Sequence, residues 1–158
     1  MKLTDLVHNN AINADLKATD RDGVLAELLE LLINAGIATD ANRQELLDAV
    51  IARENRGSTG FGKGVAVPHV KHDDATRMAA AVGVSQSGVD FNALDKQPVY
   101  SFILLLSPAE KPDEHLQAME TIFKNLSQDT FRRFLRQATS TEDVLTLLEE
   151  TDSQHLTG

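Results

Sequence analysis

Apolar residues recur at helical spacing in the first third of the chain. One stripe covers residues 24–33, between a capping pair formed by Thr19 and Asp22 and a glycine, Gly36, that is suited to end a helix. A second stripe predicts a helix over residues 40–55.

The middle of the chain changes to patterns that are typical of strands. Valines alternate with smaller residues over 64–68, which predicts a short strand. Residues 79–85 and 99–107 predict two more strands. The second of these is nearly all apolar, as expected of a strand that is covered on both faces.

Helical spacing returns after the last apolar strand. Three helices are predicted there, over apolar stripes at residues 116–126, 131–135 and 144–148. Helices and strands are interleaved without a linker or a repeat. The chain is therefore expected to form one α/β domain over residues 1–150, with a sheet covered by helices on both faces, followed by a frayed tail at 151–158.

Composition and charge exclude several classes of function. The 158 residues carry a net charge of −9 and only 4% aromatic residues, which disfavours binding to nucleic acid. The absence of cysteine excludes disulfides, thiolate metal sites and cysteine nucleophiles. No apolar leader begins the sequence, and the longest apolar run, residues 102–106, is too short to cross a bilayer. We therefore expect a cytoplasmic protein that does not insert into a membrane.

The glycine-rich stretch GSTGFGKGVAVPHV, residues 57–70, carries the candidate chemistry. Residues 57–63 fit the first seven places of a nucleotide-binding P-loop, G-x-x-x-x-G-K. A P-loop also needs a strand before it, a helix after it, and a hydroxyl residue after the lysine. Here a predicted helix precedes the stretch, a predicted strand follows it, and Gly64 stands after the lysine, so nucleotide binding is disfavoured.

The end of this stretch, Pro68-His69, favours another kind of phosphate chemistry over a plain turn with a histidine of no function. Pro68 restricts the backbone and holds His69 beside a loop of glycine amides, which are suited to bind an anion. A neutral imidazole is a competent nucleophile for a phosphoryl group, and Arg53 adds a cationic fork, besides complementing the end of its helix. The candidate phosphate-binding residues in the loop are Ser58, Thr59, Gly60 and Gly62.

These residues resemble a known family. Residues 53–69, RENRGSTGFGKGVAVPH, are similar to the signature of the enzyme IIA domains of the fructose/mannitol/nitrogen-regulatory class. These domains belong to the bacterial phosphoenolpyruvate-dependent phosphotransferase system. GVDFNALD, residues 88–95, and His115 at the start of a predicted helix resemble further family segments, and the likeness covers nearly the whole chain.

The resemblance implies a three-layer α/β fold with a mixed sheet and phosphorylation of His69 on Nε2. It also implies that His115 hydrogen-bonds His69 or the phosphate, and that no cofactor or metal is bound. Phosphate would come from the phosphohistidine of HPr, or of its nitrogen-branch counterpart, and pass to an enzyme IIB domain in sugar uptake. Alternatively, the phosphorylation state would control binding to partner proteins. One departure is Val70, where many members have glycine or alanine, and a β-branched side chain there would crowd a docking carrier.

Overall fold

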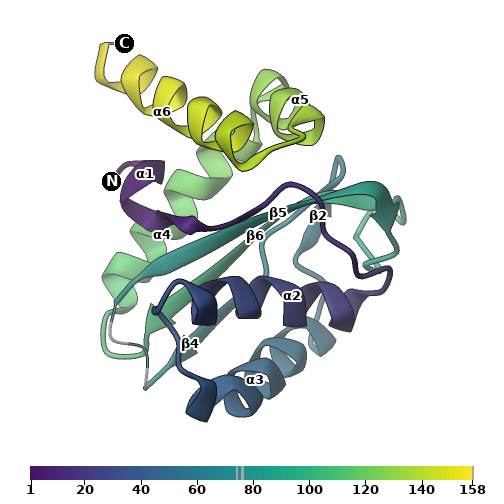
Figure 1. Cartoon of the computed structure of the whole chain (residues 1–158), viewed down its shortest axis with the longest axis vertical. Coiled ribbons are helices and arrows are strands. Elements are labelled where there is room, and N and C mark those ends of the chain that lie inside the picture. Colours follow the sequence, from purple (N-terminus) through teal and green to yellow (C-terminus); the bar gives the residue numbers. More distant parts are fainter. Residues whose placement is uncertain (74, 76, 158) are drawn as a thin grey trace.

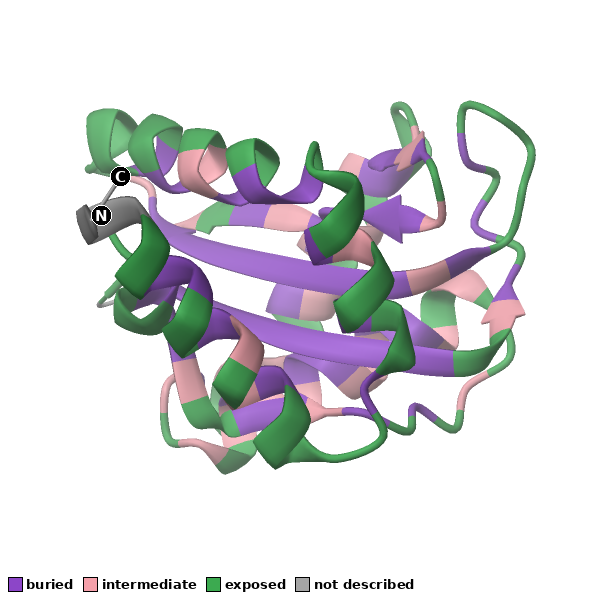
Figure 2. Cartoon of the chain, turned by 90° about the horizontal axis from the view of Figure 1, so that it is seen from above, coloured by how far each residue is buried: buried purple, intermediate pink, exposed green. Residues whose placement is uncertain are grey.

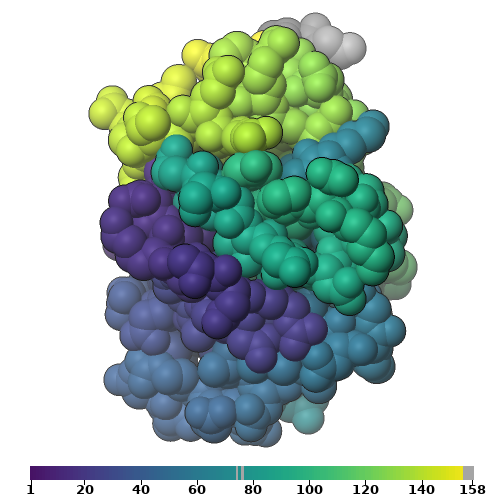
Figure 3. All heavy atoms as spheres, turned by 90° about the vertical axis from the view of Figure 1, so that its right-hand side faces the viewer, coloured from purple at the N-terminus to yellow at the C-terminus, as the bar shows by residue number. Residues whose placement is uncertain are grey.

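The computed structural model describes residues 1–73, 75 and 77–157, and in it helices cover both faces of a sheet (Figure 1). One face carries α2 (Arg21–Asn34) and α3 (Arg43–Asn55), which is preceded by the 3₁₀ turn η1 (Asp40–Asn42). The other face carries α1 (Leu3–Leu6), α4 (Pro112–Leu126), α5 (Asp129–Gln137) and α6 (Thr141–Thr157). Figure 3 shows the layers from the side, with the C-terminal helices at one end and the α2–α3 layer at the other. This arrangement confirms the predicted three-layer α/β fold.

The sheet is mixed, as expected. Its six strands in the described part of the chain are β1 (Val7–Asn13), β2 (Gly60–Gly62), β3 (Val65–Ala66), β4 (His69–His72), β5 (Ala79–Val89) and β6 (Val99–Pro108). Their order is β1-β5-β6-β3-β2, and β4 also pairs with β6. The pairs β5–β6 and β2–β3 are antiparallel, whereas β1–β5, β3–β6 and β4–β6 are parallel.

Strand β6 separates two hydrophobic clusters. Phe102, Leu104 and Leu106 pack in the cluster under α2 and α3, and Ile103 and Leu105 pack in the cluster under the C-terminal helices. Figure 2 shows the central strands as the most continuously buried part of the molecule. Burial on both faces explains why this segment is apolar at nearly every position, rather than at every second one.

Local differences from the sequence-based expectations concern boundaries and caps. The strand expected over 64–68 is reduced to β3, because Pro68 has no N–H to continue the ladder, and β4 begins only after it. Helix α2 is capped by Asp20, whose carboxylate accepts from the Gly23 amide at 2.7 Å, and not by the predicted pair Thr19 and Asp22. Gly36, with φ +78°, ends the helix as expected.

The C-terminal helix reaches back to the beginning of the chain. The Asp152 carboxylate accepts hydrogen bonds from the amides of Leu3 at 2.9 Å and Thr4 at 3.0 Å, and from the Thr4 hydroxyl at 2.7 Å. It thereby satisfies the first amides of α1, which have no partner within that helix. The segment 151–158, for which a frayed tail was expected, is helical as far as the structure describes it, to Thr157.

Candidate functional site

His69 begins β4, directly after Pro68. Its Nδ1 lies 2.8 Å from the backbone oxygen of Val67. Since a carbonyl oxygen only accepts hydrogen bonds, Nδ1 carries the proton in this contact, and Nε2 keeps its lone pair. The backbone two residues upstream therefore selects Nε2 as the nucleophilic nitrogen of the ring.

Val70, the neighbour of His69 on β4, is mostly buried. His69 is half-buried and lines a cavity; Val70 is 7% exposed and packs in the cluster under α2 and α3, and it also forms part of the lining of the same cavity. The Val70 side chain is thus turned largely into the core. Crowding of a docking carrier by the β-branched residue at position 70 stays a prediction, although most of this side chain is covered by the core.

The cavity beside His69 is strongly cationic. Its volume is about 470 Å³, and its described lining includes Arg53, Arg56 and Lys71 but no acidic side chain. Of these three cations, only Arg53 was predicted from the sequence to belong to the site. Arg56 follows Arg53 by three residues at the end of α3, a spacing that places both side chains on the same side of a helix. Lys71 follows His69 by two residues on β4, a spacing that places both side chains on the same face of a strand.

Arg53 also holds the end of its own helix. Its Nη1 donates to the backbone oxygen of Gly57 at 2.9 Å, which satisfies a carbonyl just beyond α3. Its remaining donors make no other described hydrogen bond, and its charge contributes to lowering the pKa of His69. The two roles weighed from the sequence, a cation at a helix end and a cation at the site, are compatible in one geometry.

His115 lies in the first turn of α4 and is 5% exposed. Its ring centroid is 5.7 Å from that of His69, and the two ring planes are tilted by 53°. Nδ1 of His115 lies 2.6 Å from the hydroxyl of Ser107, which in turn donates to Sδ of Met78 at 2.9 Å. Ser107 therefore fixes the orientation of the second histidine and leaves its Nε2 available.

Both histidines are neutral near pH 7. Burial is the largest influence on the pKa of His69 and lowers it from its usual 6.5. The hydrogen bond to the Val67 carbonyl, the next largest influence, raises this pKa. The charge of Arg53 lowers this pKa, Glu54 raises it, and Lys71 lowers it least. Burial likewise lowers the pKa of His115, with contributions from Lys71 and His69. The neutral form is the form of imidazole that can act as a nucleophile.

The structure places the four loop residues Ser58, Thr59, Gly60 and Gly62 outside this cavity. The Ser58 hydroxyl donates to the Phe91 oxygen at 3.2 Å and accepts from the Gly60 amide at 3.0 Å. The Thr59 amide and hydroxyl both donate to one carboxylate, and Gly62 pairs with β3. The described hydrogen bonds of these groups hold the loop itself, and phosphate binding by them stays a prediction.

The loop also positions His69 through a series of hydrogen bonds. Glu54, which is 3% exposed, accepts from the Thr59 amide at 2.6 Å and from the Thr59 hydroxyl at 2.7 Å. The Thr59 carbonyl accepts from the Val67 amide at 3.2 Å, and the Val67 carbonyl accepts from His69. This Glu54–Thr59–Val67 connection joins the end of α3 to the imidazole. This role of Glu54 was not predicted from the sequence, because a buried acceptor is recognised only when its donors are known.

The same geometry argues against a nucleotide loop. Residues 57–63 lead from α3 into β2, and a second strand, β3, follows where a P-loop would need a helix. The Lys63 amide donates to the Asp95 carboxylate at 3.1 Å. The order of elements predicted from the sequence is thus confirmed, and with it the reason for rejecting nucleotide binding.

The fold and the site together define a class of protein: a three-layer α/β chain that presents a neutral, oriented histidine beside a second histidine and three cations. The family described as "Phosphoenolpyruvate-dependent sugar phosphotransferase system, EIIA 2" matches residues 5–151. The chain belongs to this family.

Its relatives fall into sugar-transport and nitrogen-regulatory groups. A fructose-specific EIIA component of Haloferax volcanii is 33% identical over 82% of this chain and 83% of its own length. A nitrogen regulatory protein of Klebsiella oxytoca is 30% identical over 98% of this chain and 94% of its own. The fructose-specific EIIABC component of Bacillus subtilis is 30% identical, but the chain spans only 24% of its length.

A solved structure shows the same arrangement of elements. The nitrogen regulatory protein IIA-Ntr of Neisseria meningitidis has a TM-score of 0.82 and 28% identity, over 91% of this chain and 97% of that one. Within the described residues, no helix is long and apolar enough to cross a membrane.

Proposed function

We propose that this chain is a phosphocarrier that accepts a phosphoryl group on Nε2 of His69. The observation that carries the proposal is the contact between Nδ1 and the Val67 carbonyl, which leaves Nε2 as the free nitrogen at a cationic cavity. The donor is the phosphohistidine of an HPr-like carrier, or of its nitrogen-branch counterpart. The acceptor is an enzyme IIB domain. Support for this acceptor comes from a mannitol enzyme IIA of Escherichia coli, which has a similar fold, with a TM-score of 0.76, and was solved in complex with phosphorylated enzyme IIB.

The transfer needs no change in the number of protons. The lone pair of His69 Nε2 attacks phosphorus, the N–P bond of the donor breaks, and the donor ring recovers its lone pair. The proton stays on Nδ1 throughout, donated in a hydrogen bond to the Val67 carbonyl. Arg53, Arg56 and Lys71 stabilise the equatorial oxygens of the transferred group. His115 can donate to this group from Nε2 when the single proton of the Ser107 hydroxyl is donated to His115 Nδ1 rather than to Met78.

A regulatory role is the second candidate, and the length of the match favours it. The nitrogen regulatory relative aligns over nearly the whole of both chains, 98% and 94%. A phosphohistidine would bring roughly −1.5 to −2 charges into a cavity lined by three cations, by analogy with other phosphorylated side chains. The surface around His69 would lose at least half of its positive charge, and a partner protein that recognises one state would lose affinity for the other.

Phosphoryl transfer from a labelled carrier tests the first claim. The purified chain is incubated with phosphoenolpyruvate, enzyme I and HPr, and in parallel with the nitrogen-branch enzymes. We expect an acid-labile adduct on the wild type and on a His8→Ala control, which removes a histidine of β1 that lies outside the cavity. His69→Ala should remain unlabelled. Equal labelling of His69→Ala, or no labelling of the wild type with either donor set, would refute the phosphocarrier assignment.

A second measurement separates transport from regulation. The phosphorylated chain is mixed with an enzyme IIB domain, and the appearance of phospho-IIB is followed. Rapid transfer supports the sugar-uptake role. A stable phospho-form, together with a partner that binds only one of the two states, supports regulation.

A further inference from the structure

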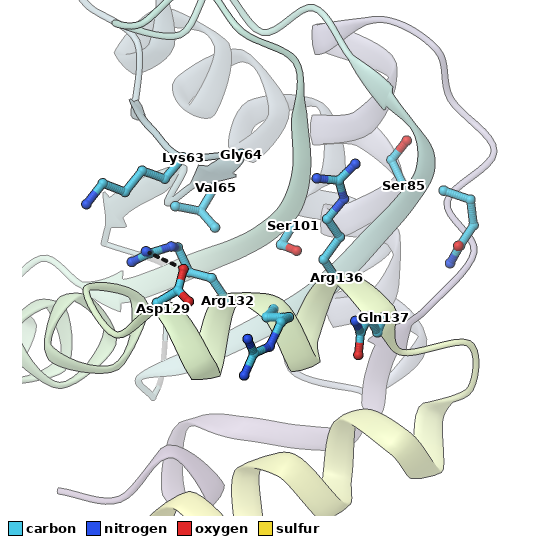
Figure 4. Close-up of a pocket in the computed structure, with 11 residues that line it drawn as sticks. Lys63, Gly64, Val65, Ser85, Ser101, Asp129, Arg132, Arg136 and Gln137 are labelled. Carbon is cyan, nitrogen blue, oxygen red and sulfur yellow. Dashed lines mark hydrogen bonds and ion pairs between the residues drawn. The ribbon is translucent and has the colours of Figure 1, made fainter.

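A second, larger cavity lies away from the histidines, between α5 and the beginning of β6 (Figure 4). Its volume is about 720 Å³, and it shares no lining residue with the cavity at His69. Ser101 on its floor pairs with Val65, whereas His69 pairs with Leu105 four residues further along β6. The two sites are therefore roughly 13 Å apart along the strand, at about 3.3 Å per residue.

Cations without a described partner distinguish this cavity. Four of its lining side chains are cationic, and one, Asp129, is acidic. Arg132 is held by the Leu126 oxygen at 2.8 Å and by Asp129 at 3.4 Å. Lys63, Arg133 and Arg136 have side chains that form no ion pair or hydrogen bond with any described residue. Three uncompensated positive charges in one hollow are unexpected in a chain of net charge −9, unless the hollow receives an anion.

One of these cations is held ready by an aromatic ring. Cζ of Arg136 lies 3.6 Å from the centroid of the Tyr100 ring, so the guanidinium is fixed in place while its donors stay free. Tyr100 is in turn packed against Gly88, where an added Cβ would lie only 2.8 Å from the ring. Glycine at position 88 therefore permits the close packing that orients Arg136.

A buried hydroxyl also faces the cavity. Ser101 is 2% exposed, lines the cavity, and its hydroxyl forms no hydrogen bond within the described part of the chain. Figure 4 shows it between Val65 on one side and Arg136 on the other. No fully buried side-chain nitrogen or oxygen of the described residues lacks a partner, so the Ser101 oxygen is open to the cavity, where a ligand oxygen could accept its hydrogen bond.

We propose that this cavity binds a small phosphate monoester. Its phosphate would accept from the Arg136 guanidinium and the Ser101 hydroxyl, with Lys63 and Arg133 compensating the second negative charge. The volume suits a whole organic ligand, because sites for small molecules commonly span about 300–1,000 Å³ and inorganic phosphate alone would leave most of it empty. This site is independent of the proposed phosphoryl transfer at His69.

Calorimetric titration of the unphosphorylated chain tests the proposal. The probes are glucose 6-phosphate, ribose 5-phosphate and AMP, with glucose, inorganic phosphate and citrate as comparison ligands. We expect at least one monoester to bind more tightly than inorganic phosphate and citrate, and glucose not to bind. The three monoesters distinguish a sugar phosphate from a nucleotide as the source of the group.

Four variants locate the binding. Arg136→Gln and Lys63→Met should each weaken it by about tenfold, as expected for a lost charge-assisted contact, and Ser101→Ala should weaken it by several-fold. Arg56→Gln, in the other cavity, should leave it unchanged. Thermal unfolding of each variant shows whether it is folded. If Arg136→Gln does not fold, Lys63→Met still tests the location of the binding site.

Three results would overturn the proposal. The first is that no monoester binds at millimolar concentration, as expected if the cavity serves an acidic protein partner. The second is that citrate binds as tightly as the monoesters. The third is that Arg56→Gln, rather than Arg136→Gln, abolishes binding, which would place the ligand at His69.

Discussion

Thr59→Val removes one hydroxyl from the connection between Glu54 and the strand that carries His69. The sequence alone predicts Thr59 as a phosphate ligand, whereas in the structure its hydroxyl donates to the Glu54 carboxylate at 2.7 Å. The two interpretations make opposite predictions. A phosphate ligand would affect the transfer rate and leave stability unchanged, and a structural contact would do the reverse.

The expected loss of stability follows from burial. Thr59 is 8% exposed and Glu54 is 3% exposed, so water does not replace the lost partner. A hydrogen bond to a charged group contributes about 1.5–3 kcal/mol, and valine has nearly the shape of threonine, so no cavity is added. We expect the free energy of unfolding to fall by about 2 kcal/mol. For a chain of this size, that corresponds to a decrease of roughly 4–8 °C in Tm.

Urea denaturation and the initial rate of phosphoryl transfer are measured on the same preparations. Thr121→Val is the matched control, because its hydroxyl bonds the Gln117 carbonyl at the surface of α4, at 2.9 Å. The control should change stability by less than about 0.5 kcal/mol. Thr59→Val should transfer phosphate at nearly the wild-type rate below its Tm. Wild-type stability together with a strongly reduced rate would refute the structural role and restore Thr59 as a phosphate ligand.

Three further predictions concern the core, the histidines and the two ends of the chain. Val70→Ala should lower the free energy of unfolding by about 1–3 kcal/mol without accelerating transfer, since the side chain is buried; faster transfer at unchanged stability would show crowding instead. The pKa values of His69 and His115 are lowered in the folded chain. Below pH 6.5, the usual pKa of histidine, these two residues therefore bind more protons in the unfolded chain than in the folded chain. Stability should therefore fall as the pH drops through this value, and replacing both histidines by alanine should flatten a urea-denaturation series from about pH 7.5 to about 5. Asp152→Ala should cost about 1–2 kcal/mol through the lost cap of α1 and lower Tm, whereas an unchanged Tm would mean that α1 is held by packing alone.

The spacing of apolar residues along the sequence predicted most of the fold, because this spacing indicates which side of each helix or strand is buried. The helices with one apolar stripe and the strand buried on both faces were found in the sequence within a few residues of their ends. Strand β1, VHNNAIN, was not predicted, because only three of its seven residues are buried and its polar positions hide the pattern. It is a strand because β5 offers it a parallel partner, which is a property of the assembled sheet.

The site was predictable where one residue type implies one chemistry. His69 after a proline, with a cation before the loop, pointed to a nucleophile and its charge partner. The hydroxyls of Ser58 and Thr59 were predicted to bind phosphate, and in the structure they donate to the Phe91 carbonyl and the Glu54 carboxylate, because a sequence shows donors without showing which acceptor they reach. Arg56 and Lys71 were overlooked, although their spacing from Arg53 and His69 already placed them on the same side.

The contact between Asp152 and α1 also has a consequence for the order of folding. It joins residues 149 positions apart in the sequence, at Leu3, and closing so long a loop carries a large entropic cost until the rest of the chain is compact. We therefore expect α1 and the end of α6 to dock last and to open first, as one unit in hydrogen exchange. Such an opening would expose Leu3 and Leu6 while β6 and the histidine cavity stay closed, so the phosphate chemistry would be insulated from motion at the two ends of the chain.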